Sequence, residues 1–79
     1  MPMQLKYDKK VDAIYITLST KKCAETKKLD DMRYVDYASD GTPVGVELLG
    51  VSGGVAVEDL PKAAELTRLL EGRDIKVFA

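Results

Sequence analysis

The strongest constraint on the fold is an alternation of apolar and polar residues in short segments joined by polar turns. This period of two is typical of half-buried β-strands. We expect five strands, at residues 3–8, 12–19, 23–29, 32–37 and 43–49. The connections are too short for parallel crossovers, so neighbouring strands should be antiparallel. The pattern predicts a five-strand antiparallel meander.

The period changes in the last third of the chain. Leucines and alanines recur at helical spacing from Leu60 to Glu71, with Asp59 as the expected N-cap and Pro61 in the first turn. Gly72 should end this helix, and residues 73–78 alternate again as a short final strand. A short helix with one apolar stripe is not stable alone and must pack on the sheet. We therefore expect one α+β domain over residues 1–79, a meander packed by one C-terminal helix.

The chain is small, with 79 residues, one cysteine (Cys23) and no histidine. A single core of this size provides little net stability, and disulfides or metals often supplement it. An intramolecular disulfide is impossible here, and a zinc site of the usual ligands is nearly excluded. Regular packing or association with another chain remains, so we expect self-association.

Charge and hydropathy restrict the compartment and the partners. The net charge is −1, which gives no overall attraction for nucleic acid or an anionic membrane. No apolar run approaches the roughly 20 residues that span a bilayer, and residues 1–5 lack the charged and apolar regions of a signal peptide. With a single cysteine, this favours a cytoplasmic protein.

Residues 7–16, with the pattern Tyr-Asp-x-x-x-Asp-Ala-x-Tyr-Ile, resemble the opening of a small prokaryotic family known as domain of unknown function 2283. The resemblance continues through residues 25–26, 29–31, 35–37 and 40–49, and the tail at 60–78 is similar to the family's longer members. After Asp30 and Asp31, where the family continues with acidic residues, this chain has Met32 and Arg33. The family brings no established catalytic residues. The resemblance implies a partner-binding role, because some members lie beside genes for small toxins and look like antitoxins or accessory proteins.

The tyrosines are the most prominent candidates for a binding surface. Aromatic side chains on a half-exposed sheet are common in protein interfaces, but ordinary cross-strand packing explains them equally well. The final strand adds apolar side chains that could meet a second chain through its open edge. The partner-binding candidates are Tyr15, Tyr34, Tyr37, Ile75 and Val77.

Carboxylates form the one group that resembles a metal or acid–base site. Asp36 and Glu47 lie on either side of the turn at Asp40 and are expected to be close, with Asp12 as a third member. Oxygen ligands of this kind suit divalent cations, but turn capping and strand ends account for most such residues. Cys23 has no histidine to activate it as a nucleophile.

Three hypotheses follow. The first is a non-enzymatic module that binds itself or another small protein and is antitoxin-like. The second is a small-ligand or divalent-metal enzyme that uses Asp12, Asp36 and Glu47, and the third is a structural subunit of a larger assembly. We expect no catalytic residues, cofactor or metal, and neither nucleic acid nor membrane as a partner.

Overall fold

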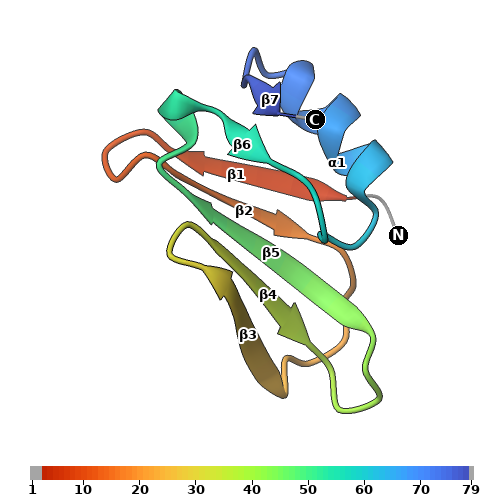
Figure 1. The fold of residues 1–79 in the computed structure, drawn as a ribbon. Helices are drawn as coiled ribbons and strands as arrows, with labels where there is room; N and C mark the ends of the chain where they lie inside the picture. Colours follow the sequence, from red (N-terminus) through yellow and green to blue (C-terminus); the bar gives the residue numbers. More distant parts are fainter. Residues whose placement is uncertain (1–2, 79) are drawn as a thin grey trace.

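The computed structural model describes residues 3–78. Residues 1, 2 and 79 lie outside the description, and the expectation that residues 1–5 are not a signal peptide falls partly on them. Five strands form one antiparallel sheet (Figure 1). The strands are β1 (Gln4–Asp8), β2 (Ala13–Thr17), β3 (Glu25–Asp30), β4 (Arg33–Tyr37) and β5 (Pro43–Leu49). The α+β class and the five antiparallel strands are confirmed.

The strand order differs from a meander. The order is β1-β2-β5-β4-β3, so β2 pairs with β5, and β3 lies at the far edge. The link between β2 and β3 crosses one end of the sheet, where Leu18 N–H donates to Val44 O at 2.8 Å and Ala24 N–H donates to Tyr37 O at 2.7 Å. At about 3.3 Å per residue, this link easily spans the roughly 14 Å of three strand spacings. The expected pairing of consecutive strands was wrong at this one connection.

Burial explains the observed order. β5 is buried at Val44, Gly45, Val46 and Leu48 and lies in the centre of the sheet, whereas every residue of β3 is exposed. Charged side chains are typical of edge strands, because they discourage pairing with other chains. The predicted edge position of β3 is therefore confirmed, and it is the reason why β3 does not lie beside the buried strand β2.

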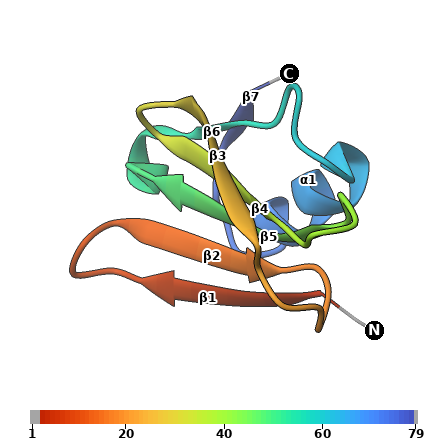
Figure 2. The same ribbon diagram turned by 90° about the horizontal axis from the view of Figure 1, so that it is seen from below.

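The C-terminal part covers one face of the sheet (Figures 1 and 2). After the 3₁₀ turn η1 (Val51–Gly53) come β6 (Val55–Ala56), helix α1 (Ala63–Glu71) and β7 (Val77–Phe78). The last strand is confirmed, and it pairs in parallel with β6 of its own chain. The apolar core between these elements and the sheet consists of Ile14, Ile16, Leu18, Val35, Val46, Leu48, Val51, Val55, Leu60, Leu66, Leu70 and Ile75.

The helix starts later than predicted. It begins after Lys62, which takes a left-handed conformation without a side-chain cap, and Asp59 also has a positive φ of 65°. Leu60 is buried in the core, and its backbone N–H closes a turn onto Val57 O. The chain thus turns twice before the helix, so Asp59 is not the N-cap. The predicted end before Gly72 is confirmed. No helix in residues 3–78 is long and apolar enough to cross a membrane.

Candidate interaction face

No element of the described chain covers the second face of the sheet, which we call the open face (Figure 2). Because side chains alternate along a strand, the residues between the core positions point to this face. They run across all five strands in register. The main members are Lys6, Tyr15, Thr17, Thr26, Lys28, Tyr34, Asp36, Gly45, Glu47 and Leu49.

One row of the open face has a symmetric chemical order. Lys6 pairs with Tyr15, Tyr15 with Glu47, Glu47 with Tyr34, and Tyr34 with Lys28. The order is therefore lysine, tyrosine, carboxylate, tyrosine, lysine. At about 4.8 Å between strands, the row is roughly 19 Å long. We call it the tyrosine row.

The side chain of Tyr15, a member of this row, extends across β5 to β4. Its hydroxyl donates a 2.7 Å hydrogen bond to Oδ2 of Asp36, and Oδ1 of the same carboxylate accepts from Thr26 Oγ1. The ring passes directly over Gly45, where a Cβ atom would lie 1.9 Å from the tyrosine oxygen. Burial raises the pKa of Tyr15 well above its ordinary value, and the hydrogen bond and negative charge of Asp36 raise it further. The phenol therefore stays protonated and keeps its hydrogen bond to Asp36.

The predicted three-carboxylate group is not formed. Asp36 faces Gly45 and Glu47 faces Tyr34, so these two acids lie on one face as diagonal neighbours. Asp12 lies in the β1–β2 turn, where its carboxylate accepts from the backbone N–H of Ser52 at 3.0 Å and from the Ser52 hydroxyl at 2.7 Å. Within residues 3–78, no group of three acidic or cysteine side chains is close enough to hold a metal ion.

The structure places the partner-binding candidates on different surfaces of the molecule. Tyr15 and Tyr34 share the open face, but Tyr37 lies on the core side, with Lys27 Nζ 5.5 Å from its ring centroid. Ile75 is a core residue that is only 8% exposed, and Val77 pairs with Val55. Only the two tyrosines of the row therefore remain together on an accessible surface.

Cys23 is exposed just before β3. Its Sγ contacts Glu25 O at 3.6 Å and Thr26 Oγ1 at 4.0 Å. Neither atom is a base that could activate a thiol.

Sequence reasoning missed an apolar hollow of about 320 Å³ where β5 leaves the sheet. Arg33 closes one side, with Nη1 donating to Ala56 O at 3.0 Å and to Glu58 O at 2.6 Å. Gly50 and Gly54 have positive φ and lie beneath the side chains of Met32 and Phe78. The pocket is lined by Asp30, Asp31, Met32, Arg33, Leu48, Leu49, Gly50, Gly54, Val55, Ala56 and Phe78.

The family model described as a protein of unknown function, DUF2283, matches residues 4–52. The chain belongs to the DUF2283 family. No curated protein and no solved structure matches it. The DUF2283 match contains all five strands of the sheet, and therefore the whole open face, while α1 and β7 lie outside the matched range.

Proposed function

We propose that this DUF2283 protein is a non-enzymatic module that binds another protein chain, either a second copy or a different small protein, through its open face. The tyrosine row is the observation that supports this proposal. Tyr15 and Tyr34 flank Glu47 on a face without cover in the described chain. Tyrosine suits such a surface because it combines a large apolar ring with a polar tip.

The polar groups of the open face favour binding over catalysis. Both oxygens of Asp36 already accept hydroxyl hydrogen bonds, from Tyr15 and Thr26. The raised pKa of Tyr15 keeps its phenol from acting as a base near neutral pH. A preordered surface loses little conformational entropy when a partner binds.

A cytoplasmic location and an antitoxin-like role belong to this proposal. The single cysteine excludes an intramolecular disulfide, which suits a reducing compartment. The antitoxin-like role follows from what the family resemblance implies. In such a role the partner would be a small protein, and the open face would supply the contact.

Affinity capture from the native host and sedimentation at low micromolar concentration test the proposal. The wild-type chain should retain a protein partner or sediment above its monomer mass of 8.7 kDa. Tyr34→Ala and Glu47→Lys should each weaken this association at least tenfold. Glu71→Lys, an exposed charge reversal on the covering helix, is the matched control and should bind normally. A wild-type monomer without a partner, or binding that Tyr34→Ala and Glu47→Lys leave at the control level, would refute the proposal.

The metal-enzyme hypothesis has its own test. We expect Mg²⁺, Ca²⁺ or Mn²⁺ at millimolar concentration to leave the melting temperature unchanged, because Asp12 binds Ser52 away from Asp36 and Glu47, which leaves two of the three predicted ligands together on the open face. A rise in melting temperature that Asp36→Asn and Glu47→Gln both abolish would support a cation site instead.

A further inference from the structure

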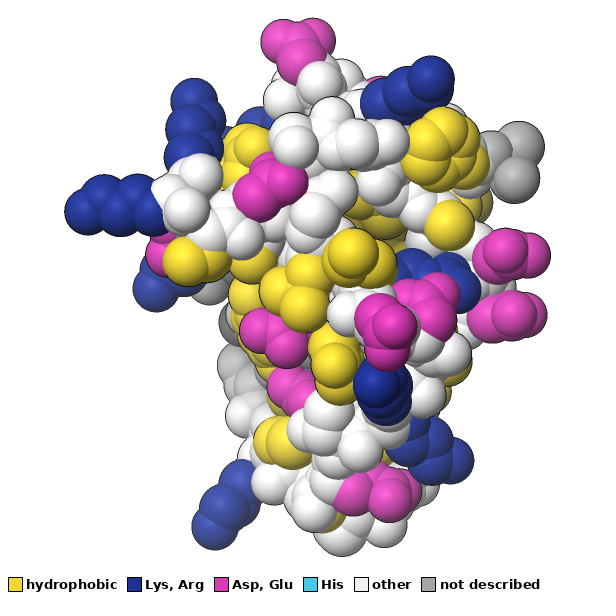
Figure 3. Space-filling view, turned by 60° about the vertical axis from the view of Figure 1, so that its left-hand side comes forward, with side chains coloured by type: hydrophobic (Ala, Val, Ile, Leu, Met, Phe, Trp, Pro, Cys, Tyr) yellow, Lys and Arg dark blue, Asp and Glu magenta, His cyan; other side chains and the backbone are white. Residues whose placement is uncertain are grey.

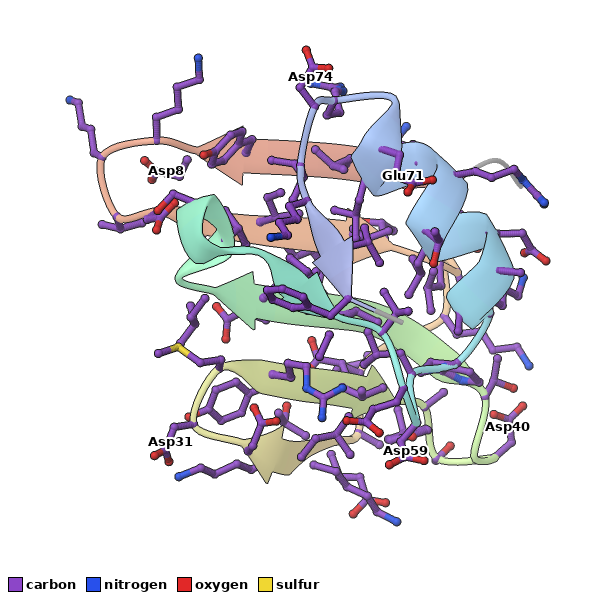
Figure 4. All side chains as sticks on the ribbon, turned by 45° about the horizontal axis from the view of Figure 1, so that its top comes forward. Asp8, Asp31, Asp40, Asp59, Glu71 and Asp74 are labelled. Atoms are coloured by element: carbon purple, nitrogen blue, oxygen red, sulfur yellow. The ribbon has the colours of Figure 1, made fainter. Side chains whose placement is uncertain are left out.

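Three segments of different character meet at one end of the sheet. Strands β1, β5 and β3 run in the same direction, because each is two antiparallel pairings from the next. The turn after β1, the end of β5 and the turn after β3 therefore lie side by side at this end, in that order. Figure 4 shows Asp8 and Asp31 at this end, and Asp40 and Asp59 at the other.

The turn after β1 presents positive charge and an apolar tip. Lys9 and Lys10 are exposed, and the Val11 that follows them is 65% exposed. The nearby acids are engaged within the chain: Asp8 accepts from the Lys10 backbone N–H at 3.0 Å, and Asp12 binds Ser52. Within residues 3–78, no carboxylate forms a salt bridge with Lys9 or Lys10. We call residues 9–11 the basic turn.

The turn after β3 presents negative charge. The Asp31 side chain is 89% exposed, and it forms an ion pair with Lys28 at 3.0 Å, on the surface. Exposed pairs of this kind contribute little and can exchange partners. The positive charge of Arg33 is turned away from solvent, because its Nε binds Asp30 Oδ2 at 2.9 Å and its Nη1 binds two backbone carbonyls. Asp31 is therefore the charge that this turn offers to a partner.

Between the two turns lies the apolar hollow. Met32 is 54% exposed and Phe78 is 42% exposed, and both border the hollow beside Leu49. Figure 3 looks toward this end, with hydrophobic side chains in the middle, Lys and Arg side chains at the upper left and elsewhere around them, and Asp and Glu side chains on both sides of the middle. The surface is thus basic, then apolar, then acidic, over about three strand spacings, or roughly 14 Å.

We propose that two copies of this chain associate through this end of the sheet, and that the Val11 tip of each copy enters the hollow of the other. The twofold axis lies in the plane of the contact and passes near Leu49. Rotation about this axis reverses the order of basic turn, hollow and acidic turn in the second copy. It places Lys9 and Lys10 of one copy against Asp31 of the second, twice by symmetry. A surface that runs from basic through apolar to acidic complements itself under such an axis, as isologous interfaces require.

This inference goes beyond the proposed function, because it places a second copy of the chain at the end of the sheet and not on the open face. It is independent of the tyrosine row, because its residues lie in the turns and the hollow. The two proposals can therefore fail separately.

The test is a pair of charge reversals studied alone and mixed. The double variant Lys9→Glu/Lys10→Glu places two carboxylates opposite Asp31 of the second copy. Asp31→Lys places an ammonium group opposite Lys9 and Lys10 of the second copy. Each variant alone should dimerise at least tenfold more weakly than wild type in sedimentation velocity. An equimolar mixture should recover a heterodimer, visible by native mass spectrometry, because both contacts then pair opposite charges. Lys22→Glu and Glu25→Lys, exposed residues toward the other end of the sheet, are the matched controls and should dimerise normally.

Recovery in the mixture also excludes misfolding as the cause of the loss. A monomeric wild type, reversals that dimerise like the controls, or a mixture without heterodimer would each overturn this inference. If Glu47→Lys abolishes the wild-type association while the charge reversals do not, the open face is the binding surface and this inference alone is wrong. The same holds if a monomeric wild type captures a different protein through Tyr34.

Discussion

The hydroxyl of Tyr15 in β2 binds the carboxylate of Asp36 in β4 at 2.7 Å, across the whole width of β5. The two residues are not on neighbouring strands, and the contact exists because Gly45 leaves room for the ring between them. This bond ties three central strands together on the open face. This link across β5 therefore depends on one glycine.

Gly45→Ala should destabilise the protein by about 1–3 kcal/mol, as is usual when a methyl group is forced into a filled site. The new Cβ would lie 1.9 Å from the tyrosine oxygen, so the ring must leave and its hydrogen bond must break. Urea denaturation measures the loss. Gly53→Ala, whose Cβ would meet nothing within 4 Å, is the control. An equally small cost for both variants would show that Tyr15 does not need this position.

Tyr15→Phe should cost about 0.5–1.5 kcal/mol near neutral pH, the usual value of one hydrogen bond. The pKa of Tyr15 is raised in the folded protein, so the unfolded chain loses its phenolic proton first, near pH 10. The stability that Tyr15 adds is complete below that pH and decreases as the pH rises toward the folded pKa. The difference between wild type and Tyr15→Phe should therefore shrink above about pH 10. Urea melts of both proteins from pH 7 to 11 measure it, and a constant difference would contradict the raised pKa.

Arg33→Lys keeps the charge but should destabilise the protein by about 1–3 kcal/mol. The guanidinium, with a side chain only 11% exposed, joins β4 to Ala56 O and Glu58 O with the same nitrogen while Nε binds Asp30. An ammonium group cannot reproduce this geometry. Chemical denaturation gives the change, with the exposed Arg73→Lys as control. Equal stability of the two variants would mean that charge alone matters at residue 33.

Leu66→Ala should cost about 2–5 kcal/mol, the range for deletion of a fully buried leucine. Leu66 has no exposed surface and lies in the core between α1 and the sheet. Leu69, which is only partly buried on the same helix, should lose less than half as much when changed to alanine. Thermal and urea unfolding compare the two. Similar losses would indicate that the helix does not cover the sheet through Leu66.

The strands could be predicted from alternation, but their order could not. The link between β2 and β3 is long enough either for a hairpin or for a crossing at the end of the sheet. Both connections satisfy the alternation of apolar and polar residues in the strands. The choice depends on which strand is buried on both sides, which is a property of the assembled sheet. The predicted start of α1 was wrong for a similar reason, because burial of Leu60 outweighed the local preference of Asp59 for an N-cap position.

Part of the site could have been predicted from the sequence. Tyr34 and Tyr37 are three residues apart in one strand and must point to opposite faces, so their separation could have been predicted. Gly45 in the middle of an apolar strand is a known sign of close approach, and it was the available signal for the Tyr15 contact. The hollow gave no such signal, because it joins residues 30–33, 48–50, 54–56 and 78, whose proximity depends on the strand order and the β6–β7 pair.

The family match ends inside η1, at the point where the chain leaves the sheet. The matched range thus describes a sheet with two faces, and the layer that covers one of them comes from the residues that follow. Within the matched range alone, buried side chains such as Ile14, Val46 and Leu48 would face water, so the shared sheet depends on the later residues for its apolar cover.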